Sequence, residues 1–256
     1  MSETPFDLTG RHALVTGASR GIGAAIARVL ADHGAHVAVH YNTGETDARM
    51  VLEALTGVGH ELVATDLSDL DQAARLPDVA ADALGGLDIV VNNAGVFEHL
   101  PRAGTDPALW REAWERTLAI NLTAPSLICD AAVPHLERAG GGHIVNVSSR
   151  GAVRGEPEAP AYGASKGGLN SLSGSLAIAL APRGIVVVSL APAWVLTDMT
   201  RPHLDGPGGD AIRAQYPSGR LVTPEELAWT TLLVVSGRAD SLSGAVLDLN
   251  GASHLR

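Results

Sequence analysis

The chain has 256 residues, with 18 Lys and Arg against 28 Asp and Glu, which gives a formal charge of −10 at pH 7. This acidic balance argues against nucleic acid as a partner, because no basic patch is available for a phosphate backbone. With 46% hydrophobic and 18% charged residues, the chain is expected to fold rather than stay disordered, and its length allows one large α/β domain or two small ones.

Cysteine usage and the absence of targeting signals favour a cytoplasmic protein. Cys129, expected in the core, is the only cysteine, which excludes an intramolecular disulfide. Residues 1–10 do not have the pattern of a signal peptide, and the sequence contains no run of about 18 apolar residues. Neither export nor a membrane anchor is therefore expected. The ten histidines form no H-E-x-x-H or similar pattern, so no metal site is expected.

Seven short apolar runs are predicted as β-strands, with amphipathic helix-length segments between them. The runs are apolar on both faces, which is typical of parallel strands covered by helices on both sides. Right-handed βαβ crossovers would then build a doubly wound sheet in a single domain over 1–256, with ligands outside the carboxyl ends of the strands. The predicted strands are 12–16, 36–40, 61–65, 88–92, 143–148, 185–190 and 245–249.

After the first strand, a glycine cluster precedes the predicted helix 23–33. Gly17, Gly21 and Gly23 have the spacing G-x-x-x-G-x-G, which would let a pyrophosphate sit at the helix N-terminus. The same stretch also fits the G-x-S-x-G nucleophile elbow of hydrolases around Ser19. Too little chain precedes Ser19 for the strand and loop that such an enzyme needs for its oxyanion hole. The cluster therefore predicts a dinucleotide site.

The end of the second strand bears on which dinucleotide binds. An Asp or Glu that would accept from an adenosine 2′-hydroxyl is missing there, where the chain reads Asn42-Thr43. Arg20 in the glycine cluster offers a cation for a 2′-phosphate. NADP(H) is therefore favoured over NAD(H), although Glu45 would reach a ribose hydroxyl if its loop folded back.

Three polar side chains are predicted near the end of the fifth strand. Ser149 follows this strand, and Tyr162 and Lys166 lie four residues apart, on one face of a helix. An ammonium beside a phenol stabilises the phenolate and brings its pKa toward the range useful for proton transfer. Alone, such a pair is usually a surface pair. With Ser149 at the same sheet edge, the three side chains predict hydride-transfer chemistry on an alcohol or carbonyl.

Beyond the sixth strand, residues 193–219 are predicted to form a substrate-binding loop or lid. Its irregular part, 201–219, is rich in Gly and Pro and is long for a simple connection. Thr223 and Pro224 then mark a helix start, as an N-cap followed by proline at the first helical position.

These motifs together resemble the short-chain dehydrogenase/reductase family over nearly the whole chain. The motifs are 16–23, Asn92-Asn93-Ala94-Gly95, Ser149, Tyr162-x-x-x-Lys166 and 192–197. The resemblance implies a one-domain Rossmann fold with strand order 3-2-1-4-5-6-7. It also implies a catalytic tetrad of Asn121, Ser149, Tyr162 and Lys166, in which Ser positions the carbonyl, Tyr is the acid/base, Lys tunes Tyr and binds the ribose, and Asn holds a relay water.

The same resemblance, added to the glycine cluster, implies the cofactor contacts. Asp66 would lie near the adenine, or would simply cap a helix. Val195 and Thr197 would lie at the nicotinamide carboxamide. The expected cofactor-binding residues are Gly17, Ser19, Arg20, Gly21, Ile22, Gly23, Asn42, Thr43, Asp66, Leu67, Asn93, Ala94, Gly95, Tyr162, Lys166, Pro192, Val195 and Thr197.

One departure from the family pattern lies after the sixth strand. The usual Pro-Gly is Pro192-Ala193 here, and Ala would be strained if its φ were positive. Trp194, which follows, is expected to face the cofactor or substrate. The other candidates for the substrate pocket are His99, Arg154 and Tyr216.

The sequence thus predicts an NADP(H)-dependent ketoreductase or alcohol dehydrogenase. The segments 219–226 and 242–244 look like the 3-oxoacyl-(acyl-carrier-protein) reductase branch, so a carrier-bound thioester is one expected substrate. A cyclic ketone, steroid, sugar or other metabolite carbonyl is the alternative, and a non-catalytic NADP(H)-sensing scaffold is the alternative of another class. Trp110 and Trp114 share a helix face, either in the core or at a subunit contact, and the resemblance favours a homotetramer or homodimer.

Overall fold

The computed structural model describes residues 6–100, 106–198 and 200–255. Its centre is one seven-stranded sheet in the order β3-β2-β1-β4-β5-β6-β7, in which every pairing is parallel. This confirms the predicted fold class and strand order. The strands are β1 (His12–Val15), β2 (His36–Tyr41), β3 (Glu61–Ala64), β4 (Ile89–Asn92), β5 (Gly142–Val147), β6 (Ile185–Pro192) and β7 (Val246–Leu249).

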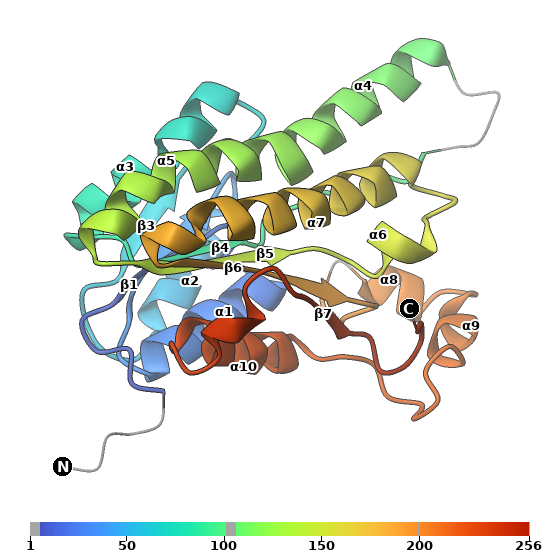
Figure 1. The fold of residues 1–256 in the computed structure, drawn as a ribbon. Coiled ribbons are helices and arrows are strands. Elements are labelled where there is room, and N and C mark those ends of the chain that lie inside the picture. The colour runs from blue at the N-terminus through green and yellow to red at the C-terminus, as the bar shows by residue number, and fades with distance from the viewer. Residues whose placement is uncertain (1–5, 101–105, 199, 256) are drawn as a thin grey trace.

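Helices cover both faces of this sheet (Figure 1). One layer contains α1, α2 and α10, and the other contains α3, α4, α5 and α7, with α5 packed on α3 and α4 on α7. The long helices are α1 (Gly21–Asp32), α2 (Glu45–Glu53), α3 (Leu70–Leu84), α4 (Pro107–Leu118), α5 (Ala124–Arg138), α7 (Pro160–Leu180) and α10 (Pro224–Val235).

The core is split by the sheet, as strands with two covered faces require. Successive side chains of a strand point to opposite faces. Ala13 and Val15 of β1 therefore pack into the core under α1 and α10, whereas Leu14 between them packs into the core under α3 and α5. All three are fully buried. This explains why the sequence shows continuous apolar runs rather than alternation.

Local signals place several helix ends. Asp69 caps α3, because its carboxylate accepts hydrogen bonds from the backbone N–H groups of Asp71 and Gln72. Thr223 and Glu226 form a capping box at the start of α10, with Pro224 at its first turn. The helix start predicted at Thr223 is therefore confirmed.

The segment 201–219 is less irregular than its composition predicts. It contains two short helices, α8 (Arg201–Leu204) and α9 (Gly209–Arg213). A further short helix, α6 (Gly151–Arg154), follows β5. Figure 1 shows that α6, α8 and α9 gather beyond the carboxyl ends of the strands, the edge at which ligands bind in such sheets.

One helical run, Pro107–Arg138, has the length and apolar composition of a membrane span, with a mean hydropathy of 1.2 in its best window. Part of this window is buried inside the protein. On α5, Ile128, Ala132 and Leu136 are fully buried against the sheet, and so is Cys129, as expected. The α5 part of this run is therefore a core helix, whereas much of α4 is exposed.

Candidate active site

The glycine-rich loop between β1 and α1 is held against the end of β4. The Asn93 side-chain amide donates to the carbonyl oxygens of Thr16 (2.9 Å) and Gly17 (3.1 Å). In return, the Thr16 hydroxyl accepts from the backbone N–H of Asn93 at 2.9 Å. Gly17 has a φ of +63°, and a Cβ there would lie 2.9 Å from the Cα of Ala94. Only glycine fits this close approach.

Gly23 has a packing role that differs from the predicted cofactor contact. A Cβ on Gly23 would lie 2.4 Å from the Gly17 carbonyl oxygen and 2.5 Å from the Asn93 amide nitrogen. Gly23 does not line the groove described below. Its missing side chain lets the first turn of α1 pack against the loop, and its contact with the cofactor stays a prediction.

His40 of β2 was not predicted as a site residue, and it holds the glycine-rich loop in place by a hydrogen bond to Gly17. This side chain is 2% exposed. Its Nδ1 accepts from the Gly17 N–H at 3.0 Å, and its Nε2 lies 3.1 Å from the Thr65 carbonyl oxygen. Burial lowers the pKa of His40 to about 4, so the ring is neutral, with the proton on Nε2. The only sequence signal was a polar residue within an otherwise apolar strand.

A groove of about 410 Å³ runs along this edge of the sheet. No side chain caps α1 at its start, so the N–H groups of its first turn remain available to an anion. The groove fits an extended dinucleotide with its pyrophosphate at this helix. It is lined by all the predicted cofactor residues except Gly23, namely Gly17, Ser19, Arg20, Gly21, Ile22, Asn42, Thr43, Asp66, Leu67, Asn93, Ala94, Gly95, Tyr162, Lys166, Pro192, Val195 and Thr197.

The groove end beside β2 carries the charges that bear on cofactor choice. Arg20 is exposed and, like Asn42, lines the groove. Glu45, the alternative considered for a ribose hydroxyl, instead pairs with Arg49 at 2.8 Å. Asp66 lines the groove, and its Oδ1 accepts from the backbone N–H of Ser68 at 2.9 Å. It does not cap α3, because Asp69 is the N-cap of that helix.

Ser149, Tyr162 and Lys166 come together at the other end of the groove. The Lys166 ammonium donates to the Val147 carbonyl oxygen at 2.7 Å and lies 5.8 Å from the centroid of the Tyr162 ring. Burial lowers the pKa of Lys166 to about 8. Burial raises the pKa of Tyr162, and its hydrogen bond with Ser149 acts in the opposite direction. The Phe97 ring packs edge-on against Tyr162, with centroids 5.0 Å apart.

Asn121 lies in a turn of π-helix, Ala119–Thr123, between α4 and α5. Its amide is fully buried and pairs with both backbone groups of Val96, accepting from N–H at 2.8 Å and donating to C=O at 2.9 Å. A Cβ on Gly95 would lie 3.3 Å from Asn121 Oδ1 and 3.5 Å from Lys166 Nζ. The π-turn thus sets Asn121 beside the same backbone segment that Lys166 approaches.

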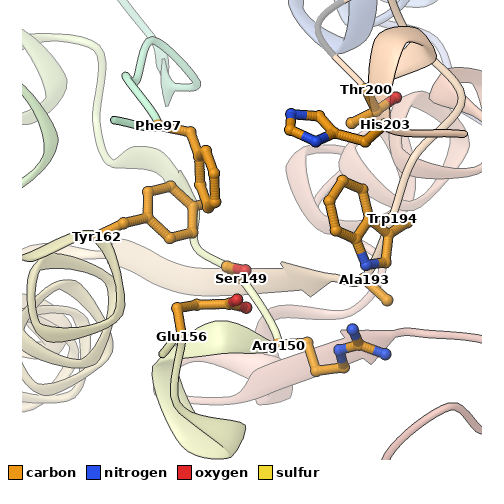
Figure 2. Close-up of a pocket in the computed structure, with 9 residues that line it drawn as sticks. All are labelled: Phe97, Ser149, Arg150, Glu156, Tyr162, Ala193, Trp194, Thr200 and His203. Atoms are coloured by element: carbon orange, nitrogen blue, oxygen red, sulfur yellow. The ribbon is translucent and has the colours of Figure 1, made fainter. Parts of the chain in front are cut away.

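A smaller pocket of about 100 Å³ opens beside Ser149 and Tyr162 (Figure 2). Trp194 lines it, as expected. The pocket is lined by Phe97, Ser149, Arg150, Glu156, Tyr162, Ala193, Trp194, Thr200 and His203. Phe97, Glu156 and His203 were not predicted from the sequence, because three separate segments bring them together.

The other three substrate candidates do not line this pocket. His99 is exposed and lies 3.7 Å from Glu158. Arg154, also exposed, donates to the side chain of Gln215 at 3.1 Å. Tyr216 is buried behind the wall, where its hydroxyl donates to the Trp194 carbonyl oxygen at 3.0 Å. Each of the three side chains thus has a partner outside this pocket, and their contact with the substrate stays a prediction.

The replacement of glycine by Ala193 does not strain the loop. Within the described ranges, the non-glycine residues with positive φ are Phe6 and Ala252, so Ala193 has an ordinary backbone conformation. Its N–H donates to the Leu249 carbonyl oxygen at 3.2 Å. Over the same residues, no group of three or more His, Cys, Asp or Glu side chains is placed to hold a metal ion.

Comparison with known proteins agrees with this arrangement. The family model described as enoyl-(acyl carrier protein) reductase matches residues 17–254. A D-threitol dehydrogenase of Mycolicibacterium smegmatis is 37% identical, with 96% of this chain and 94% of the relative covered. A 3-oxoacyl-(acyl-carrier-protein) reductase of Vibrio cholerae is 34% identical, with 98% and 100% covered.

Solved structures show the same fold. The structure of a short-chain dehydrogenase from Burkholderia cenocepacia in complex with NADP is 35% identical, has a TM-score of 0.87, and covers 96% of this chain and 98% of its own. The motifs, the strand order and these matches over nearly full length lead to one assignment. The chain belongs to the short-chain dehydrogenase/reductase family of oxidoreductases.

Proposed function

We propose that this chain is an NADP(H)-dependent enzyme that interconverts a secondary alcohol and a ketone, with Tyr162 as the acid/base. One observation carries the proposal: Ser149 and Tyr162 line both the long groove and the small pocket. A dinucleotide in the groove and a substrate in the pocket would therefore meet at these two hydroxyl groups.

The side chains have distinct tasks in the reduction. Ser149 donates a hydrogen bond to the ketone oxygen, and Tyr162 gives its phenolic proton to the same oxygen as negative charge develops there. When bound, the nicotinamide supplies the hydride that the carbonyl carbon receives. Lys166, held by the Val147 carbonyl oxygen, stabilises the phenolate that remains on Tyr162. Asn121 and its Val96 partner hold the relay that returns the proton.

Arg20 supports NADP(H) over NAD(H). It is exposed at the end of the groove, and no hydrogen bond or ion pair engages its guanidinium within the described part of the chain. A 2′-phosphate would supply the missing anionic partner. The relative from Burkholderia cenocepacia was crystallised with NADP, which supports the same choice.

Several finer predictions remain proposals. A carrier-bound 3-oxoacyl thioester is supported by the Vibrio cholerae relative, and a cytoplasmic location by the lone cysteine. The residues 193–219 are proposed to close over the substrate, since Ala193, Trp194 and His203 line the pocket. Trp110, 37% exposed, lies 6.1 Å from Trp114 between ring centroids, which supports a subunit contact in a homotetramer or homodimer.

The test is NADPH oxidation by the purified protein over a panel of ketones, including 3-oxoacyl thioesters, with NADH in parallel. Turnover of at least one ketone is expected, with NADPH preferred over NADH. Demonstrated NADPH binding with no turnover of any ketone or alcohol in the panel would contradict the proposal. Turnover of the thioesters would assign the acyl substrate.

A further inference from the structure

The small pocket contains ionisable groups that the proposed reaction does not use, namely Arg150, Glu156 and His203, and the first two carry opposite charges. Arg150 follows Ser149 at the end of β5, and Glu156 lies in the segment between α6 and α7. Figure 2 shows the Glu156 carboxylate pointing toward Ser149, on the same side of the pocket as Arg150. Aromatic rings form the opposite walls. A carboxylate and a guanidinium beside aromatic walls require an explanation, because burying charge costs free energy.

The Glu156 side chain fits beside Gly151, but its carboxylate has no hydrogen-bonding partner among the described residues. A Cβ on Gly151 would lie 2.6 Å from Glu156 Oε1, so the carboxylate occupies space that this glycine leaves open. It is half-buried, and it accepts no hydrogen bond and forms no ion pair within the residues that the structure describes. Burial raises the pKa of Glu156, whereas the positive charges of Arg150 and Arg154 lower it.

Arg150 is a buried cation that is only partly satisfied. The residue is 4% exposed, and its Nη1 donates to the Ser253 hydroxyl at 2.7 Å. Its Nε is buried and has no partner among the described residues. The guanidinium therefore offsets the carboxylate charge without neutralising it through a direct salt bridge. An acceptor for substrate hydroxyl groups is thus left open in the pocket.

The size of the pocket limits the substrate. Since one water-sized group needs about 10–15 Å³, a volume of about 100 Å³ holds on the order of seven to ten such groups. This space suits a small molecule. A carboxylate at this depth also disfavours a purely apolar chain, because such a chain would displace water from Glu156 without offering a donor.

We propose that Glu156 is a specificity-determining residue whose carboxylate accepts a hydrogen bond from a hydroxyl next to the reacting carbinol. The substrate is then a small vicinal polyol or the corresponding hydroxyketone. Ser149 and Tyr162 would hold the reacting oxygen, and Glu156 lines the same pocket with its carboxylate pointing toward Ser149. This assignment rests on the proposed secondary-alcohol chemistry and deepens it.

The experiment compares a vicinal butanediol with the butanol that lacks its second hydroxyl, as substrates for oxidation with NADP+. A hydrogen bond to a charged acceptor predicts that the wild type prefers the diol by about 10- to 100-fold in kcat/KM. Glu156→Leu removes the acceptor and should reduce this preference by about tenfold or more, and Glu156→Gln, which keeps a neutral acceptor, by less. Turnover of the butanol by the same variant is the reference from which each preference is calculated.

Glu53→Gln at the exposed end of α2 is the matched control, since it removes a charge far from the pocket and should not change the preference. NADPH affinity and the thermal midpoint of each variant report on cofactor binding and folding separately. Equal diol preference in the wild type and both Glu156 variants would overturn the inference and leave the proposed function standing. Turnover of neither alcohol by a wild type that reduces other ketones of the panel would overturn the inference alone, whereas no turnover of any ketone or alcohol would contradict the proposed function as well.

Discussion

The environment of Tyr162 combines opposing electrostatic effects. Burial raises the pKa of its phenol, and the hydrogen bond with Ser149 lowers it. Lys166 lies 5.8 Å from the centre of the Tyr162 ring, where its ammonium favours the phenolate. Since burial lowers the pKa of Lys166 to about 8, this ammonium is mostly charged at neutral pH. Ser149 and Lys166 therefore favour loss of the Tyr162 proton, although burial of the phenol disfavours its charged form.

Replacing Tyr162 by Phe tests this role directly. The Tyr162→Phe variant keeps the ring that packs on Phe97 but loses the proton donor, so kcat for ketone reduction should fall by about 10²- to 10⁴-fold. The affinity for NADPH, measured by fluorescence titration, should stay within about twofold of wild type. Turnover close to the wild-type rate would contradict the assignment of Tyr162 as acid/base.

Arg20 is expected to determine the preference for NADPH over NADH. Arg20→Ala should weaken NADPH binding by about 10- to 100-fold, because a charge-assisted contact to the 2′-phosphate is lost. NADH binding should change by less than about twofold. Arg28→Ala, which removes an exposed cation further along α1, serves as the control in the same titrations. An equal loss of affinity for both cofactors in Arg20→Ala would exclude a role in phosphate recognition.

At the scale of elements, the site depends on how closely the glycine-rich loop approaches the end of β4. The hydrogen bonds of Asn93 and Thr16 close this contact, and His40 holds the loop from β2. Three parallel strands are thus tied together at one edge. The π-turn between α4 and α5 likewise holds Asn121 in place, because its side-chain amide forms two hydrogen bonds with the Val96 backbone.

Gly17→Ala should disrupt this contact. Both its positive φ and the 2.9 Å approach to the Ala94 Cα disfavour a side chain, so NADPH affinity should fall by tenfold or more. Gly85→Ala, at the end of α3, is the matched control: its φ is +85°, and a Cβ there would have nothing within 4 Å.

Backbone strain alone should cost either variant about 1–2 kcal/mol of stability in denaturant unfolding. Only the Gly17 variant should also lose cofactor affinity. If Gly85→Ala lost the same affinity, or if Gly17→Ala bound NADPH normally, the loop contact would not be what shapes the groove.

At the scale of the whole molecule, buried His40 makes stability depend on pH. Its pKa is lowered from 6.5 to about 4 by burial, so the unfolded chain takes up this proton before the folded chain does. Stability contributed by neutral His40 is therefore fully present above pH 6.5 and declines as the pH falls toward 4. At about 1.4 kcal/mol per pKa unit, the decline amounts to roughly 3 kcal/mol.

Urea unfolding of the wild type and His40→Asn across this pH range measures that contribution. The free energy of unfolding of the wild type should fall more steeply from pH 6.5 to 4 than that of the variant. His143, whose pKa burial also lowers, is present in both proteins and does not affect the difference. Parallel pH curves for the two proteins would show that His40 does not titrate in this way.

The architecture was predictable from the sequence because its signals are local or periodic. A strand covered on both faces is a continuous apolar run, and the seven predicted strands match those observed to within two residues at each end. The spacing of Tyr162 and Lys166 on one helix, and of the glycines around α1, likewise depends only on helix geometry and the turn before it. The family motifs extend the same kind of information to the tetrad.

Only the tertiary structure decided which side chains line the small pocket. Glu156, Phe97 and His203 come from separate segments, and no sequence pattern brings them to one pocket. His99, Arg154 and Tyr216 were plausible by position but find partners elsewhere. Gly23 was expected to contact a cofactor, yet packing against Gly17 is what excludes a side chain there. Long-range packing determines these outcomes, because a side chain takes the partner that the folded chain places nearest to it.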